Sequence, residues 1–268
     1  MPTNPNRTAS AESAALMATL ADVRPDASTA CSAWSVHDIV AHLAAGAKEH
    51  ADLIEHRLSG RPERATRGFE ERELPFRALD HDTLMGRLVD EISRKQRAYE
   101  ALAASEDPSI AFTGTRLTKE KSALHSRSEA ALHRWDITGD DDTSQTLLSQ
   151  PELASHAVWV LDNMAVLDES AQALGARAGR TAPATVAFRA ASQPDIVLTL
   201  SQTGSRFQII PESADADMVL TMRADHRPLV LWGRKPAALV LAIEGDRDLL
   251  PLLAKTLWHD ATPWPKAV

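Results

Sequence analysis

The spacing of apolar residues divides the chain into a helical first half and a second half of short strands. Four stretches carry apolar side chains at intervals of three and four residues, as amphipathic helices do: residues 11–23, 34–58, 81–105 and 117–138. Residues 151–175 predict a fifth helix, with Pro151 at its start and Gly175 past its end. The charged segment 61–80 contains two prolines, so we expect a loop or short irregular structure there. Helices of this length with modest loops predict a helical bundle.

Polar residues mark where two of these helices begin. Ser10 precedes the first helix and is suited to cap it, because a serine hydroxyl can accept a hydrogen bond from the free N–H groups of the first turn. Ser35 followed by Asp38 has the spacing of a capping box with the shorter acid. We therefore expect helices to start at residues 11 and 36.

After residue 180 the pattern changes to short, β-branched and partly alternating segments. Four of them predict strands: residues 184–190, 195–202, 205–211 and 217–223. Residues 226–234 and 247–258 are again helical in pattern. The predicted class is α+β, with a four-helix bundle and linking fifth helix in residues 1–178. A small α/β domain with a short mixed or antiparallel sheet would follow in residues 179–268.

Composition narrows the classes of partner and compartment. The formal net charge of −8 argues against nucleic-acid and membrane-surface binding, which need concentrated basic patches. No stretch is apolar enough to span a bilayer, and the first ten residues lack the apolar core of a signal peptide. Cys31 is the only cysteine, so an intrachain disulfide is impossible and a reducing cytoplasm is expected. Any metal must then be held by histidine and carboxylate ligands.

The stretch "SEAALHRWD", residues 128–136, places two such ligands on one helix face. Glu129 and His133 are four residues apart, so their side chains lie one above the other. A metal with an open coordination position usually takes three protein ligands. His42 lies on the inward side of the second helix, which it shares with Ile39 and Leu43, and can supply the third. Spacing alone leaves two interpretations open: a metal site, or a solvated pair and an unrelated core histidine.

Several motifs resemble one family. "CSAWSVHDIVAHL", followed far downstream by "EAALHRWDI", is similar to the N-terminal domain of mycothiol-dependent maleylpyruvate isomerases, within the DinB-like metal-binding bundle superfamily. The matching features are Trp34 with His42 eight residues later, and the Glu129–His133 pair on the last bundle helix. The segment "HRPLVLWGRKPAALVLAIEGDRDLL" is similar to the second domain of the family. The family often has Cys-Pro-Gly-Trp where this chain has "CSAW", and residues 60–115 show no clear correspondence.

The resemblance implies a metal site, a thiol cofactor and an active-site arginine. Its metal ligands fall on His42, Glu129 and His133, and the arginine that faces the active site from the second domain falls on Arg234. The implied cofactors are a divalent metal, usually zinc, and the small thiol mycothiol. A zinc-bound thiol is deprotonated at neutral pH, so Cys31 need not be the nucleophile. Arg234 would hold a substrate carboxylate or stabilise an enolate; alternatively it only caps its helix.

The resemblance leaves the reaction open. Cis–trans isomerisation of a small electrophilic substrate and S-transfer to it both use an activated thiol, and they differ in whether a stable conjugate accumulates. A non-catalytic ligand-binding or regulatory protein on the same scaffold is the alternative of another class. Asp38 and Asp136 are candidates to accept the second N–H of a ligating histidine, although Asp38 is also the acid expected at the helix start. A monomer or weak homodimer is expected.

Overall fold

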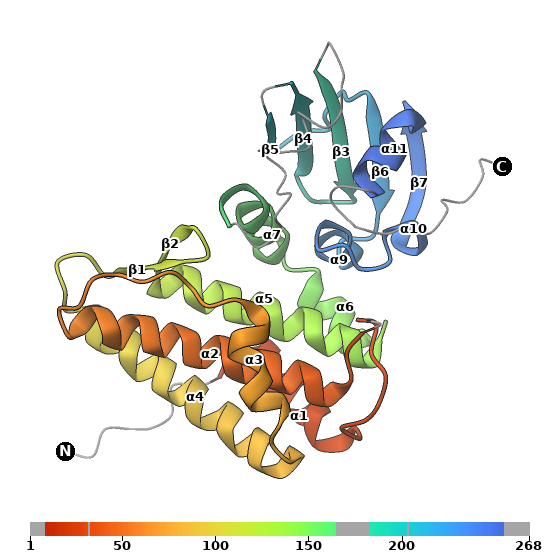
Figure 1. Ribbon diagram of the computed structural model, residues 1–268. Helices are drawn as coiled ribbons and strands as arrows, with labels where there is room; N and C mark the ends of the chain where they lie inside the picture. Colours follow the sequence, from red (N-terminus) through yellow and green to blue (C-terminus); the bar gives the residue numbers. More distant parts are fainter. Residues whose placement is uncertain (1–8, 32, 165–182, 203, 255–268) are drawn as a thin grey trace. The chain divides into compact units, whose positions relative to one another are not determined.

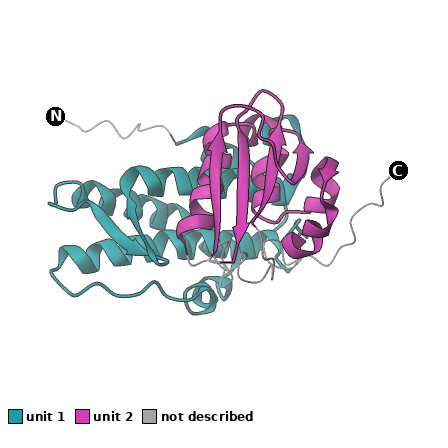
Figure 2. Ribbon diagram, turned by 90° about the horizontal axis from the view of Figure 1, so that it is seen from above, with its two compact units in different colours: residues 1–144 teal, residues 145–268 magenta. Residues whose placement is uncertain are grey.

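The computed structural model describes residues 9–31, 33–164, 183–202 and 204–254. The chain divides into two compact units, residues 1–144 and 145–268 (Figure 2). Helices dominate the first unit and a mixed five-stranded sheet lies in the second, which confirms the predicted α+β class. The boundary predicted between residues 178 and 179 lies outside the described residues.

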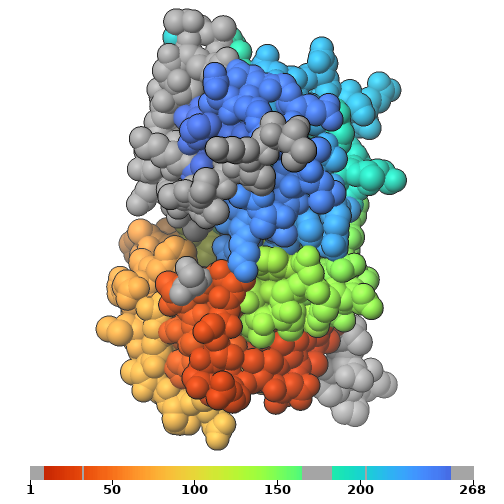
Figure 3. Space-filling view, turned by 90° about the vertical axis from the view of Figure 1, so that its right-hand side faces the viewer, coloured from red at the N-terminus to blue at the C-terminus, as the bar shows by residue number. Residues whose placement is uncertain are grey.

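Four long helices build the first unit (Figure 1): α1 (Ala11–Asp22), α2 (Val36–Leu58), α4 (His81–Leu102) and α5 (Lys119–Thr138). Each of the four stretches predicted from sequence is thus a helix. Helix α2 packs against α4, and α1 packs against α5. Helices α1 (red) and α5 (green) are far apart in sequence but lie side by side, as the red and green surfaces in Figure 3 show.

Local hydrogen bonds fix where these helices begin. The Ser10 hydroxyl accepts a hydrogen bond from the backbone N–H of Ser13, which confirms the predicted cap of α1. At α2 both halves of the capping box form: the Ser35 hydroxyl accepts from the N–H of Asp38, whose carboxylate accepts from the N–H of Ser35. Such caps stabilise a helix by about 1 kcal/mol. The start of α2 thereby sets the position of His42, two turns further along.

A seam of small and apolar side chains joins the helices of the bundle. Val36, Ile39 and Val40 on α2 are fully buried. The alanines of α2 lie in one core cluster with Leu84 and Leu88 of α4. Small side chains let helix backbones approach closely, and each buried leucine contributes about 1.5–3 kcal/mol. The apolar stripe read from the sequence therefore forms the bundle core.

The prediction of irregular structure for residues 61–80 is wrong in part, because Phe69–Arg77 form helix α3. Pro75 inside this helix lacks the N–H of an ordinary turn, which lowers the local helix preference of the segment. Burial of Phe76 and the hydrogen bonds of the buried Glu73 to His42 and Arg77 compensate. A short hairpin, β1 (Ser109–Phe112) and β2 (Thr115–Thr118), which the sequence did not predict, connects α4 to α5.

The second unit contains a five-stranded sheet with the order β5-β4-β3-β6-β7. Its strands are β3 (Ala184–Ala190), β4 (Asp195–Ser201), β5 (Gly204–Ile210), β6 (Met218–Met222) and β7 (Val240–Gly245). Only the central β3–β6 pair is parallel, so the sheet is mixed. Ala187 and Phe188 are neighbours on opposite faces of β3, and both are fully buried, so both faces of the central strand are covered. Strands β3 to β6 were predicted and β7 was not.

Short helices complete the second unit: α7 (Pro151–Asn163), α9 (His226–Leu231), α10 (Pro236–Leu239), the 3-10 turn Arg247–Leu249 and α11 (Leu250–Leu253). Helix α6 (Asp142–Leu148), not predicted, spans the division between the units. The predicted fifth helix begins at Pro151 as expected, while its end near Gly175 lies outside the described residues. No helix in the described parts of the chain is long and apolar enough to cross a membrane.

Candidate metal centre

Three potential ligands from two helices meet inside the first unit. His42 of α2 and Glu129 and His133 of α5, called the triad below, each offer a ligand atom within 4.8 Å of the others. Both histidines turn Nε2 toward the same carboxylate oxygen: Glu129 Oε2 lies 3.2 Å from His42 Nε2 and 3.5 Å from His133 Nε2. The structure thus brings together all three residues that the sequence proposed as ligands.

The triad is sheltered but not closed. The exposed fraction of the side chain is 5% for His133, 13% for His42 and 17% for Glu129. The Trp34 ring lies 4.9 Å from the His42 ring and 5.9 Å from the His133 ring, between centroids. On another side Phe69 of α3 stacks on His42 at 5.8 Å. Aromatic walls therefore surround the imidazoles, while the partial exposure leaves room for a small fourth ligand.

Each histidine of the triad is held by a second, buried carboxylate. Nδ1–H of His42 donates to Glu73 Oε1 at 2.7 Å, and Nδ1–H of His133 donates to Asp136 Oδ2 at 2.9 Å. Both carboxylates are fully buried. A carboxylate on Nδ1 fixes the tautomer that leaves a lone pair on Nε2, which is the arrangement typical of metal-ligating histidines. The donor set therefore fits a divalent cation.

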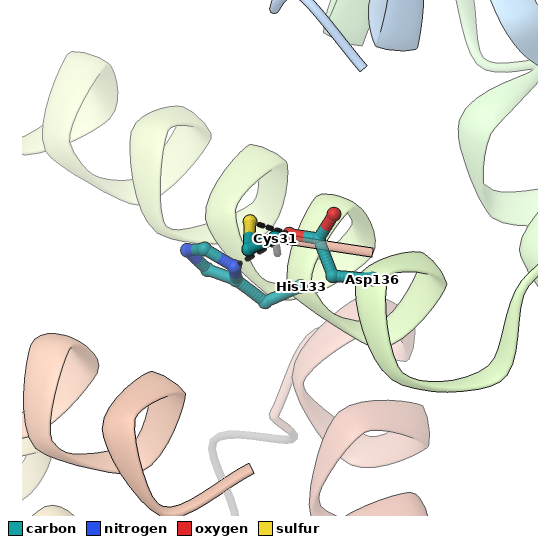
Figure 4. Close-up of side chains that lie close together, drawn as sticks. All are labelled: Cys31, His133 and Asp136. Atoms are coloured by element: carbon teal, nitrogen blue, oxygen red, sulfur yellow. Dashed lines mark hydrogen bonds and ion pairs between the residues drawn. The ribbon is translucent and has the colours of Figure 1, made fainter. Parts of the chain in front are cut away.

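Asp136 is itself fixed by the lone cysteine. The Cys31 thiol donates to Asp136 Oδ2 at 3.2 Å, so Asp136 accepts hydrogen bonds from both Cys31 and His133 (Figure 4). Cys31, His133 and Asp136 also form a second group with potential ligand atoms within 4.8 Å of one another. A neighbouring carboxylate disfavours the thiolate, so we interpret Cys31 as a residue that positions Asp136.

The charges around the triad suit a bound cation. Burial raises the pKa of Glu129, but hydrogen bonds from His133 and His42 outweigh it and hold the pKa well below its usual value. Burial lowers the pKa of His133, yet its bonds to Asp136 and Glu129 raise it to about 9. In the metal-free protein at neutral pH, a proton on His133 thus balances the anionic Glu129 and Asp136. A metal ion would replace that proton.

Other residues singled out from the sequence have different surroundings. Asp38 is engaged in the α2 capping box rather than with a histidine, so only Asp136 of the two candidates meets the triad. Arg234 lies in the turn after α9, where its side chain donates to the carbonyl of Trp232. It belongs to the second unit, and its catalytic role stays a prediction.

Glu73 is the functional residue that sequence reasoning missed. It lies in the segment interpreted as irregular, so no helical position could be assigned to it. Its carboxylate also accepts from Arg77 at 2.5 Å, and these partners hold the pKa of Glu73 below its usual value despite burial. The available signal was the acidic, helix-compatible run "FEERE" before Pro75.

Comparisons with known proteins address family and fold. Residues 6–138 match the family model described as the mycothiol maleylpyruvate isomerase N-terminal domain. Two similar solved structures are the crystal structure of the mycothiol-dependent maleylpyruvate isomerase, with a TM-score of 0.54, and that of a histidine-to-alanine mutant, with 0.53. Each is 11% identical, and each alignment covers 85% of this chain and 87% of the other. None of the curated proteins matches the chain. At this identity the structural likeness concerns the fold.

Proposed function

Because this chain belongs to the mycothiol-dependent maleylpyruvate isomerase family through residues 6–138, we propose that it is a mycothiol-dependent metalloenzyme. It would activate the thiol for cis–trans isomerisation of, or S-transfer to, a small electrophilic substrate. The observation that carries this proposal is the convergence of His42, Glu129 and His133, with each imidazole backed by a buried carboxylate. A reducing cytoplasm is the compartment that suits such chemistry.

The protein's own residues would act as follows. His42, Glu129 and His133 hold the cation, zinc in our proposal, through two imidazoles and one carboxylate. When bound, the cation lowers the pKa of a thiol so that the sulfur is a thiolate at neutral pH. Glu73 and Asp136 keep the imidazoles in the ligating tautomer. Trp34 and Phe69 restrict water at the imidazoles, which strengthens electrostatic interactions there.

Arg234 is our sequence-based candidate for recognition of the substrate. Its guanidinium would hold a carboxylate by two parallel hydrogen bonds or stabilise developing enolate charge. This role is proposed on the resemblance alone, and Arg234→Lys, which keeps the charge but loses the planar fork, is the variant that examines it.

The decisive experiment is elemental analysis joined to thiol binding. We expect about one zinc per chain in the wild type and loss of metal and mycothiol binding in His42→Ala and Glu129→Gln. His56→Ala is the matched control, because His56 lies on the same helix but donates to the carbonyl of Pro62. Unchanged metal content in His42→Ala would refute the site.

The same preparation separates the remaining alternatives. Metal without mycothiol binding would preserve the site but exclude the thiol. With both bound, accumulation of a stable thiol conjugate identifies an S-transferase, whereas a trans product with recovered thiol identifies an isomerase. Binding of both without turnover of any conjugated electrophile would favour the non-catalytic alternative.

A further inference from the structure

A buried arginine near the triad has no hydrogen-bonded partner among the described residues. Arg72 of α3 is only 8% exposed, yet no hydrogen bond or ion pair joins its guanidinium to another described residue. Its Nε is buried without an acceptor. The guanidinium carbon lies 4.3 Å from the centroid of the Phe69 ring, which in turn stacks on His42. One aromatic ring therefore separates this cation from a triad imidazole.

The carboxylates nearest to Arg72 are engaged elsewhere. Glu73, its neighbour in sequence, accepts from His42 and from Arg77. Glu49 is fully buried and accepts from two arginines of the segment before α3. Removing a guanidinium from water without a hydrogen-bonded anion is costly, and only the Phe69 ring and more distant charges offset that cost. Within the described parts of the chain, the Nε of Arg72 thus has no acceptor.

A second cation faces the same region from α4. Lys95 is half-buried, and its Nζ donates to Ser126 Oγ at 2.7 Å, with no carboxylate within ion-pair distance among the described residues. Ser126 lies on α5, one turn before Glu129. Burial lowers the pKa of Lys95 to about 8, against the opposing charge of Glu129.

Both cations act on one group of residues. Arg72 and Lys95 each interact electrostatically with Glu129, and each also interacts with His50 and His125. Once a divalent cation takes Glu129 as a ligand, Lys95 loses that opposing charge, and the carboxylates that still act on Arg72, Glu73 and Glu49, are bonded to other arginines. Two sheltered cations without a hydrogen-bonded carboxylate favour the binding of an anion.

Resting on the metal centre proposed above, we propose that Arg72 and Lys95 form a carboxylate-binding subsite beside the triad, built by the first unit alone. A guanidinium binds a planar carboxylate through two parallel hydrogen bonds, and an ammonium adds a point charge. The subsite would hold one carboxylate of the substrate next to the metal-activated thiol, so that substrate recognition does not depend on Arg234 alone.

Binding of a simple anion tests this without turnover. Titration calorimetry measures the affinity of the full chain for maleate. The wild type, Arg72→Gln and Lys95→Met are each titrated as metal-free and as zinc-loaded protein. We expect each variant to weaken maleate binding about tenfold or more, because a hydrogen-bonded charge is lost. Maleamide, the neutral analogue, should bind all of them equally. Arg97→Gln is the control, since Arg97 is an exposed arginine on the same helix as Lys95.

The possible outcomes are distinct. Maleate affinity that is unchanged in both variants, equal losses for maleamide, or no maleate binding by the wild type would each overturn the subsite. Zinc uptake measured on the same protein separates the subsite from the proposed function: a wild type that takes up no zinc but binds maleate through Arg72 refutes the metal centre only. Should Arg72→Gln not fold, Lys95→Met and the charge-retaining Arg72→Lys decide the question.

Discussion

Zinc binding should expel a proton from His133, and the number of protons released is the sharpest test of the proposed centre. His133 Nε2 faces Glu129, and Nδ1 faces Asp136. These two anions outweigh burial and raise the pKa of the imidazole to about 9. A histidine must be neutral to ligate, so metal and proton compete for Nε2.

The magnitude follows from the distance between pH and pKa. At pH 7 a group with a pKa of about 9 is deprotonated in about 1% of molecules. The apparent zinc affinity is therefore about a hundredfold below that of a site in which His133 is fully deprotonated. This corresponds to about 3 kcal/mol. Between pH 7 and 8 the apparent Kd should fall about tenfold, and the curve should flatten as pH approaches 9.

The assay is titration calorimetry at pH 7 in two buffers with different ionisation enthalpies, with a chelator to keep free zinc low. About one proton per zinc is expected from His133. In Asp136→Asn the anion that holds Nδ1–H is gone, so the proton count should drop and zinc affinity should fall about 10- to 100-fold. Asp38→Asn, whose carboxylate serves the α2 capping box, should release as many protons as the wild type. Equal proton counts in the wild type and Asp136→Asn, or a Kd that is flat from pH 7 to 8.5, would refute the reasoning.

Three further predictions concern stability and the buried carboxylates. In metal-free protein the pKa of His133 lies above the ordinary 6.5, so its protonation stabilises the fold by about 3 kcal/mol. This contribution is fully present below pH 6.5 and is lost as pH rises to about 9. Melting curves should show the loss in the wild type and not in His133→Ala. Glu73→Gln should weaken zinc binding about tenfold in a chelator competition assay, because His42 loses its buried anion, whereas Glu71→Gln on the same helix, exposed to solvent, should bind as the wild type does. Gly245→Ala should lower the free energy of unfolding in urea by about 1–3 kcal/mol, since Gly245 has φ +84° and a Cβ would meet the Asp217 carbonyl oxygen at 2.1 Å. Gly86→Ala, in open space on α4, should instead raise it by about 0.5–1 kcal/mol. A stabilising Gly245→Ala or a destabilising Gly86→Ala would contradict the backbone argument.

Features that depend on neighbours along the chain could be predicted from the sequence. The caps at Ser10 and Ser35 form through residues three positions away, and the long helices follow apolar spacing. The contact between Glu129 and His133 follows from a separation of four residues on a helix, and that between His133 and Asp136 from a separation of three. Helix spacing indicated His42 among the histidines of α2, because it shares the inward side with Ile39 and Leu43, and the family resemblance then assigned it as a ligand. Its place beside Glu129 agrees with that selection, while its role as a ligand stays a prediction.

The tertiary structure alone decided which groups other than Asp136 surround the triad. Glu73 reaches His42 only because α3 docks on α2, and the charged, proline-containing sequence of α3 gives little local sign of a helix. Cys31 reaches Asp136 across 105 residues of chain. Among the described residues, Arg72 has no hydrogen-bonded acceptor, because Glu73 is bonded to His42 and Arg77 and Glu49 to other arginines. Helix periodicity is a local property of the backbone, whereas the partner of a buried charge depends on which elements pack together. The sequence therefore determined the pair Glu129–His133 and the nearby Asp136, and packing determined Glu73, Cys31 and the cations around them.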